Sequence, residues 1–143
     1  LTLTGSDNQL SAGTLTFEGI FSATTALLTG SSGDDQFTIT GTNTLNTANI
    51  SFSEVDTVNA GLGSDSLKGS DGEDRFEITD LNALMANNIA FSGISSVDAL
   101  GGIDTVNGAE DAEWLLTGNN KEARNSGILF SEVETLTATN ATL

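Results

Sequence analysis

Cysteine, proline, histidine and tyrosine are all absent from this chain of 143 residues. Without cysteine, neither a disulfide framework nor a thiolate metal site can form. Basic residues are scarce as well, with 4 Lys and Arg against 20 Asp and Glu, which gives a formal net charge of −16. A surface this acidic repels nucleic acid and anionic lipid and attracts cations. We therefore expect no nucleic-acid partner, and metal cations are the better candidates.

Long apolar runs are also missing from the sequence. No run approaches about 18 apolar residues and no basic-then-apolar leader opens the chain, so we expect neither membrane insertion nor a signal peptide. The apolar content of 37% is nevertheless enough for one domain with a packed core. The chain starts at Leu1 and its one methionine is Met85, so we expect a segment of a larger protein.

An internal repeat with a period of 38 to 39 residues organises the chain. Residues 37–75 read FTITGTNTLNTANISFSEVDTVNAGLGSDSLKGSDGEDR, and residues 76–113 read FEITDLNALMANNIAFSGISSVDALGGIDTVNGAEDAE. Residues 1–36 form a looser copy, and residues 114–143 form an incomplete one. We predict one solenoid segment, 1–143, built from these repeats.

Short strands are predicted within each repeat. Apolar residues alternate with Thr, Ser or Asn in FTIT, NISFS, DTVNA and DSLKG, which is the period of a β-strand. The stretch 80–88, DLNALMANN, favours a helix by composition, but it aligns with GTNTLNTAN in the preceding repeat, which does not. We predict a loop or a single turn there.

The apolar residues fall into two columns, which predicts about two rungs per repeat. The first column holds Phe37, Val58, Phe76, Val97, Trp114 and Leu136, and the second holds Ile50, Leu67, Ile89, Val106 and Ile128. Stacking of such columns is typical of an all-β parallel β-solenoid, a β-helix or β-roll. An immunoglobulin-like sandwich is the alternative, but it does not require self-similarity between repeats.

Glycine and aspartate recur in nine-residue units, such as AGLGSDSLK at 60–68 and GSDGEDRFE at 69–77. With GSSGDDQFT at 30–38 and LGGIDTVNG at 100–108, these units resemble the nonapeptides of the RTX family of secreted bacterial proteins. The recurring order F-x-I-T, I-x-F-S-x-V, G-x-D-S-L is similar to tandem β-strand repeats of large hemagglutinin-like bacterial surface adhesins. The resemblance implies a secreted or cell-surface protein whose Gly-rich turns bind calcium between rungs.

Five aspartates are the candidate metal ligands. The resemblance implies Asp35, Asp65, Asp74 and Asp104, each next to turn glycines, since calcium accepts many oxygen ligands in flexible geometry. Asp56 joins them because Asp35, Asp56 and Asp74 each stand two residues before a first-column residue, so a solenoid would stack their carboxylates. Bound cations would relieve the repulsion between them. The alternative is that these turns are tight polar corners that favour Gly and Asp for backbone reasons.

The function that these features favour is a non-enzymatic structural repeat, or stalk, of a large bacterial adhesin, with neighbouring repeats of the same parent chain as its partners. The alternative is a calcium-dependent adhesive module for a cell-surface or glycan ligand. A polysaccharide-active β-helix enzyme is the remote third class, since the chain lacks histidine and tyrosine and has no basic groove evident for an acidic substrate.

Overall fold

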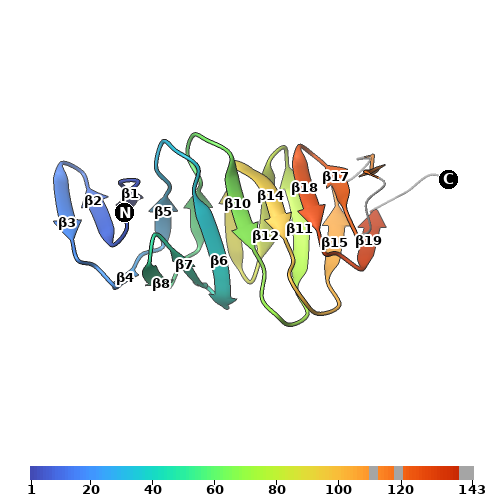
Figure 1. The fold of residues 1–143 in the computed structure, drawn as a ribbon, viewed down its shortest axis with the longest axis horizontal. Helices are drawn as coiled ribbons and strands as arrows, with labels where there is room; N and C mark the ends of the chain where they lie inside the picture. The colour runs from blue at the N-terminus through green and yellow to red at the C-terminus, as the bar shows by residue number, and fades with distance from the viewer. Residues whose placement is uncertain (110–112, 118–120, 139–143) are drawn as a thin grey trace.

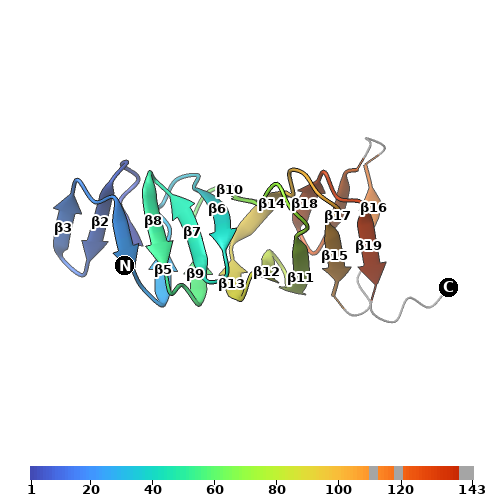
Figure 2. The ribbon, with the colours of Figure 1, turned by 90° about the horizontal axis from the view of Figure 1, so that it is seen from below.

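The computed structural model describes residues 1–109, 113–117 and 121–138. These residues form 19 β-strands and no helix. The molecule is elongated, and the chain advances along its long axis from β3 at one end to β16 and β19 at the other (Figures 1 and 2). The predicted all-β solenoid is confirmed.

The strands fall into four successive groups. The first is β1 (Thr2–Leu3), β2 (Gln9–Ala12), β3 (Leu15–Glu18), β4 (Ser22–Thr24) and β5 (Leu27–Thr29). The second is β6 (Gln36–Gly41), β7 (Thr44–Thr47), β8 (Ile50–Ser53), β9 (Thr57–Asn59) and β10 (Asp65–Lys68). The third is β11 (Arg75–Asp80), β12 (Ala83–Ala86), β13 (Ile89–Ser92), β14 (Ile94–Asp98) and β15 (Thr105–Gly108). The fourth is β16 (Leu115–Leu116), β17 (Ala123–Asn125), β18 (Ile128–Ser131) and β19 (Thr135–Ala138).

Two sheets, of ten and nine strands, share these groups in a regular way. The first three strands of a group form an antiparallel meander in one sheet, the fourth strand crosses to the other sheet, and the fifth returns. The meanders themselves alternate, so β1–β3 and β11–β13 lie in the ten-stranded sheet and β6–β8 and β16–β18 in the nine-stranded sheet. Consecutive repeats are therefore built on opposite faces of the solenoid.

Consecutive groups are joined only by parallel pairs among the described strands. The fourth strand of each group pairs with the third strand of the next, as in β9 with β13 and β14 with β18. The fifth strand pairs with the fourth strand of the next group, as in β10 with β14. The antiparallel pairs are confined to the meanders. The parallel solenoid thus carries a three-stranded antiparallel insertion in every repeat.

The core is a continuous apolar stack between the sheets, but the predicted columns are wrong. Phe37 is paired with Leu67, Leu67 with Val97, and Val97 with Phe130, all in the nine-stranded sheet. Phe76 lies in the other sheet and is paired with Val106. Because one repeat carries a residue to the opposite sheet, Phe37 and Phe76 cannot share a column. Burial itself is correctly predicted for most of these residues, although Trp114 and Leu136 are only partly buried.

The stretch 80–88 is a further correction, since it contains strand β12 instead of a loop or single turn. Leu84 and Ala86 point into the core, and Met85 between them is 41% exposed. The strand is bounded by left-handed asparagines, Asn82 before it and Asn87–Asn88 after it, whose positive φ angles reverse the chain. Its low strand propensity is overridden by pairing on both sides, with β11 and β13.

A ladder of asparagines ties each repeat to the next. Asn8, Asn43 and Asn82 occupy the turn between the first two strands of their groups, with φ of 56°, 54° and 53°. Each donates a side-chain hydrogen bond within its own repeat, to the carbonyl oxygens of Ile20, Val55 and Ile94. Each also donates one to the next repeat, to the carbonyl oxygens of Asn49, Asn88 and Gly127, at 3.0, 3.2 and 3.2 Å. Lys121 stands at the equivalent position in the fourth group, with φ 61°.

Truncation of the stacked phenylalanines tests the core. Phe76 is fully buried whereas Phe17 is 44% exposed. We expect Phe76→Ala to lower the free energy of unfolding by about 3 to 5 kcal/mol, because it leaves a cavity in a packed interior. Phe17→Ala is the matched control and should cost about half as much or less. Equal losses in chemical denaturation would contradict the burial described.

The asparagine ladder is tested by Asn82→Ala and Asn82→Gly. Alanine loses the hydrogen bonds and strains a left-handed backbone, so we expect a loss of about 2 to 3 kcal/mol. Glycine tolerates the backbone and loses only the hydrogen bonds, so it should cost less. Asn46→Ala, on the exposed face of β7, is the control and should change stability by less than about 0.5 kcal/mol. An Asn82→Ala variant as stable as this control would contradict a tie between repeats.

Candidate functional site: paired Gly-Asp turns and a polar pocket

Two pairs of Gly-Asp turns lie at opposite edges of the solenoid, because turn 60–65 precedes strand β10 and turn 69–74 follows it. In the first pair, turn 30–35 stacks on turn 60–65; in the second, turn 69–74 stacks on turn 99–104. The leading turns have the same internal geometry. Asp35 Oδ2 accepts hydrogen bonds from the backbone N–H and hydroxyl of Ser31, at 2.6 and 3.0 Å, and Asp74 Oδ2 accepts the same bonds from Ser70. These aspartates therefore close their own turns.

Glycine is required where the paired turns touch. A Cβ on Gly30 would lie 1.9 Å from the carbonyl oxygen of Ala60, and one on Gly63 would lie 2.6 Å from that of Gly33. Gly63 also has a φ of +122°, which other residues rarely adopt. The backbones of the two turns are thus in direct contact, and carbonyl oxygens are brought to the contact.

Asp65 and Asp104 are the second carboxylates of the two pairs, and both are fully buried. Asp65 Oδ1 accepts the backbone N–H of Asp35 at 2.8 Å, and Asp104 Oδ1 accepts that of Asp74 at 2.8 Å. In both residues Oδ2 is buried with no hydrogen-bond partner. A buried carboxylate oxygen without a partner is costly, so these two atoms need an explanation.

Burial raises the pKa of both buried aspartates above the ordinary value. For Asp65 the main cause is loss of hydration; the charges of Asp35 and Asp34 add to it, and the hydrogen bond from Asp35 N–H opposes it. For Asp104 the main cause is again loss of hydration, and the charges of Asp74 and Glu134 add to the rise in pKa. The two sites therefore favour either a proton or a cation next to the carboxylate.

The second pair of turns is extended by a further acid. Asp104 donates its backbone N–H to Glu134 Oε2 at 2.8 Å, so a chain of acids runs from Asp74 through Asp104 to Glu134. Glu134 also forms an ion pair with Lys121. The N–H of Asp104 and the Lys121 charge lower the pKa of Glu134. This end of the chain of acids is neutralised by the protein itself.

The structure brings the predicted metal ligands together as two pairs, Asp35 with Asp65 and Asp74 with Asp104. Asp56 does not join them: it is exposed, lies before β9, and accepts a hydrogen bond from Asn43 Nδ2 at 3.2 Å. The predicted stack of Asp35, Asp56 and Asp74 is wrong, because β6, β9 and β11 are not neighbours in a sheet. The carboxylates that do stack are 30 residues apart, a spacing shorter than the sequence repeat.

The oxygen donors at each pair of turns suit calcium better than a transition metal. Carboxylate and carbonyl oxygens are hard ligands, and calcium accepts them in irregular geometry. The partnerless Oδ2 of Asp65 or Asp104 would be one ligand, and turn carbonyls could supply others. Within the described ranges, however, no three acids, histidines or cysteines are grouped so as to hold a metal. Each pair of turns therefore offers at most two carboxylates.

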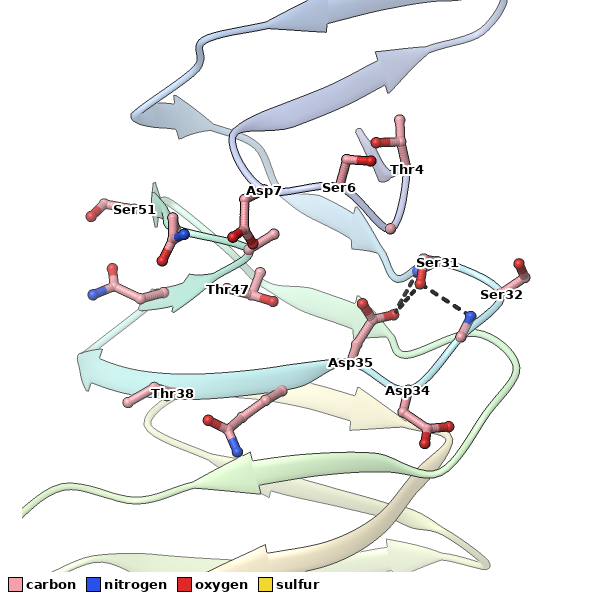
Figure 3. Close-up of a pocket in the computed structure, with 16 residues that line it drawn as sticks. Thr4, Ser6, Asp7, Ser31, Ser32, Asp34, Asp35, Thr38, Thr47 and Ser51 are labelled. Atoms are coloured by element: carbon pink, nitrogen blue, oxygen red, sulfur yellow. Dashed lines mark hydrogen bonds between the residues drawn. The ribbon is translucent and has the colours of Figure 1, made fainter.

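A polar pocket of about 730 Å³ lies beside the first pair of turns. Its walls are the loop at 4–7, the turn at 31–36 and outward residues of β6, β7 and β8. Figure 3 shows Asp7 and Asp35 facing it from opposite sides, with the hydroxyls of Ser6 and Ser31 nearby. The walls carry hydroxyl, amide and carboxylate groups and no lysine or arginine. Such a lining suits a polyhydroxylated or cationic ligand and disfavours a polyanion.

The pocket was not expected from the sequence, and small side chains explain it. Thr38 and Asn46, paired across β6 and β7, line it. The equivalent pair in the next repeat is Glu77 and Met85, which have longer side chains. The difference in residue size at equivalent positions of the repeats is the one sequence signal that could have predicted the pocket.

Comparison of the chain with protein-family models, curated proteins and solved structures found no match. Within the described residues, no long apolar helix of the bilayer-spanning kind occurs.

The buried carboxylates predict a specific pH dependence of stability. Since the pKa of Asp65 is raised on folding, the folded state binds the proton more tightly, and this stabilisation is lost as pH rises through the folded pKa. In chelator, Asp65→Asn should thus gain stability relative to the parent chain as pH increases from about 3 to 7. Urea denaturation at several pH values measures it, with exposed Asp56→Asn as the control. A pH-independent difference would contradict the raised pKa.

Proposed function

We propose that this chain is a non-enzymatic structural segment, a stalk, of a large secreted or cell-surface bacterial adhesin. The observation that carries the proposal is the continuity between repeats. Each repeat joins the next through parallel strands, a shared apolar core and the asparagine ladder. Such a stack can be lengthened by adding repeats without changing any existing contact, which is what a spacer between an anchor and a distant ligand needs.

The polar groups support a structural role over catalysis. Asp35 and Asp74 are committed to their own turns through Ser31 and Ser70, and Asp65 and Asp104 are buried. A general base must reach a substrate proton, and none of these four carboxylates combines exposure with a positioned proton-transfer partner. The resemblance of the repeats to hemagglutinin-like adhesins supplies the cellular setting of the proposal.

Single-molecule pulling between the chain ends tests the stalk. A stack of cooperative repeats should resist force and unfold in steps, each releasing up to about 130 Å, the extended length of some 39 residues. A panel of neutral glycans is the parallel arm, and a stalk should show no saturable binding. Release in one step at negligible force would contradict the proposal. Saturable glycan binding that is lost in Asp7→Ala would favour the adhesive module instead.

Calcium binding at the paired turns is the second candidate function. The observation that favours it is the pair of buried, partnerless oxygens, Asp65 Oδ2 and Asp104 Oδ2. A calcium ion would neutralise each carboxylate and supply the missing partner. In this case the segment would be rigid only where calcium is plentiful, as outside the cell.

Melting curves with and without calcium test this candidate. A ligand bound only by the folded state raises the melting temperature by mass action, so millimolar calcium should raise it and magnesium should raise it less. Asp65→Asn with Asp104→Asn should abolish the calcium effect, and Asp56→Asn should leave it intact. Identical curves for the parent chain in chelator, calcium and magnesium would instead show that the turns are polar corners that bind no metal.

A further inference from the structure

The N-terminal end of the solenoid exposes residues of a kind that is buried in every other group. We call this the β3 end surface, formed by Leu15 and Phe17 on β3 and Ala23 on β4. Leu15 is 64% exposed and Phe17 is 44% exposed. Both lie in a meander whose central strand is buried normally, since Leu10 on β2 is 3% exposed. The exposure is therefore a property of the outer edge and not of a loosely packed group.

The equivalent residues of the three later groups are covered. The equivalents of Leu15 are Ile50, Ile89 and Ile128, all 0% exposed, and those of Phe17 are Phe52, Phe91 and Phe130, at most 2% exposed. These equivalences follow from the strand pairs, because Leu10–Phe17, Leu45–Phe52, Leu84–Phe91 and Ala123–Phe130 are the same pair in successive meanders. The strand that covers the equivalent residues in the later groups therefore shows which element would cover Leu15 and Phe17.

The missing element is a parallel strand from a preceding group. Phe52, Phe91 and Phe130 are each opposite an aliphatic residue on a fourth strand, namely Ala23, Val58 and Val97. The backbone bonds are also repeated. Ser51 N–H donates to the Phe21 carbonyl and Ala90 N–H to that of Asp56, while the N–H groups of Thr25, Ala60 and Ala99 donate to the carbonyls of Ser53, Ser92 and Ser131. The equivalent groups on β3 are the N–H of Thr16 and the carbonyl of Glu18.

We propose that the β3 end surface is a docking site for one further turn of this same repeat, whose fourth strand pairs in parallel with β3 and places an aliphatic residue opposite Phe17. That strand has the pattern polar, aliphatic, polar, as in Thr57-Val58-Asn59 and Thr135-Leu136-Thr137. The inference deepens the proposed stalk by naming the residues that receive the neighbouring repeat, and it rests on that proposal only for its cellular setting.

The occupant is a complete turn and not simply a second copy of this chain. Strand β19 could pair with β3, since its outer edge carries no described strand and Leu136 would face Phe17. In the other sheet, however, the outer edges of β4 and β16 would both remain unpaired at the junction. Elsewhere in the fold these edges are covered by the fifth strand of a group. The equivalent of β4 is β9, which pairs with β5, and the equivalent of β16 is β6, which pairs with β10. A turn that supplies both a fourth and a fifth strand leaves no gap.

The test is to place a copy of residues 37–75 directly before Leu1. The junction then puts Arg75 before β1 as it stands before Phe76, and the added copies of Val58 and Leu67 fall opposite Phe17 and Ala23. Amide exchange of Thr16 should slow at least about tenfold, because its N–H gains a partner. Phe17→Ala should lower the melting temperature more in the lengthened chain than in the 143-residue chain.

A matched lengthened chain carries Val58→Asp in the added copy only, which puts a charge opposite Phe17. It should lose both the slowed exchange of Thr16 and the greater effect of Phe17→Ala. Unchanged Thr16 exchange in the unmodified lengthened chain would overturn the inference, and so would an added turn that stays unstructured. Either result would leave the pulling experiment to decide the stalk, since that experiment uses only the contacts between the existing repeats.

Discussion

The left-handed asparagine between the first two strands of a repeat is the constraint on which the rest of the solenoid depends. Its backbone conformation reverses the chain into the meander, and its amide holds the meander of the next repeat at a fixed height. Once that height is set, the fourth strand of the asparagine's own repeat pairs with the third strand of the next repeat. The apolar residues of the two strands then come into register. A local turn preference and the long-range stacking are thus specified by the same side chain.

The repeat, the strands and the burial of residues such as Phe37 and Ile89 are predictable from the sequence, because alternation and recurrence are local signals. The pairing of columns is not, because no local signal states that successive repeats occupy opposite sheets. Strand β12 is missed for a related reason, since Ala83–Ala86 becomes a strand only through its two neighbours. At the candidate site the aspartates are found from the Gly-Asp pattern, whereas their pairing 30 residues apart depends on the fold.

The buried acids set the chemical character of the two edges that carry the turns. Asp65 and Asp104 are placed at contacts between turns, where glycine lets backbones touch and water is excluded. The charge of each is opposed by burial and by acidic neighbours, which raise its pKa, so both turns favour a proton or a cation next to the carboxylate. The apolar core and the asparagine ladder require neither a bound proton nor a bound cation. The solenoid therefore combines a core that does not depend on bound ions or protons with two edges whose stability depends on the surrounding solution.

The alternation of repeats between the two sheets is the central claim, and thiol cross-linking tests it most directly because the chain has no cysteine of its own. Lys68 and Asp98 belong to consecutive repeats and are partners on adjacent parallel strands of the nine-stranded sheet, whereas Asn59, the equivalent of Asp98 in the preceding repeat, lies in the ten-stranded sheet. A short bifunctional reagent should join cysteines placed at 68 and 98 under native conditions and leave a pair at 59 and 98 unlinked. Efficient linkage of 59 to 98, with none of 68 to 98, would contradict the alternating architecture.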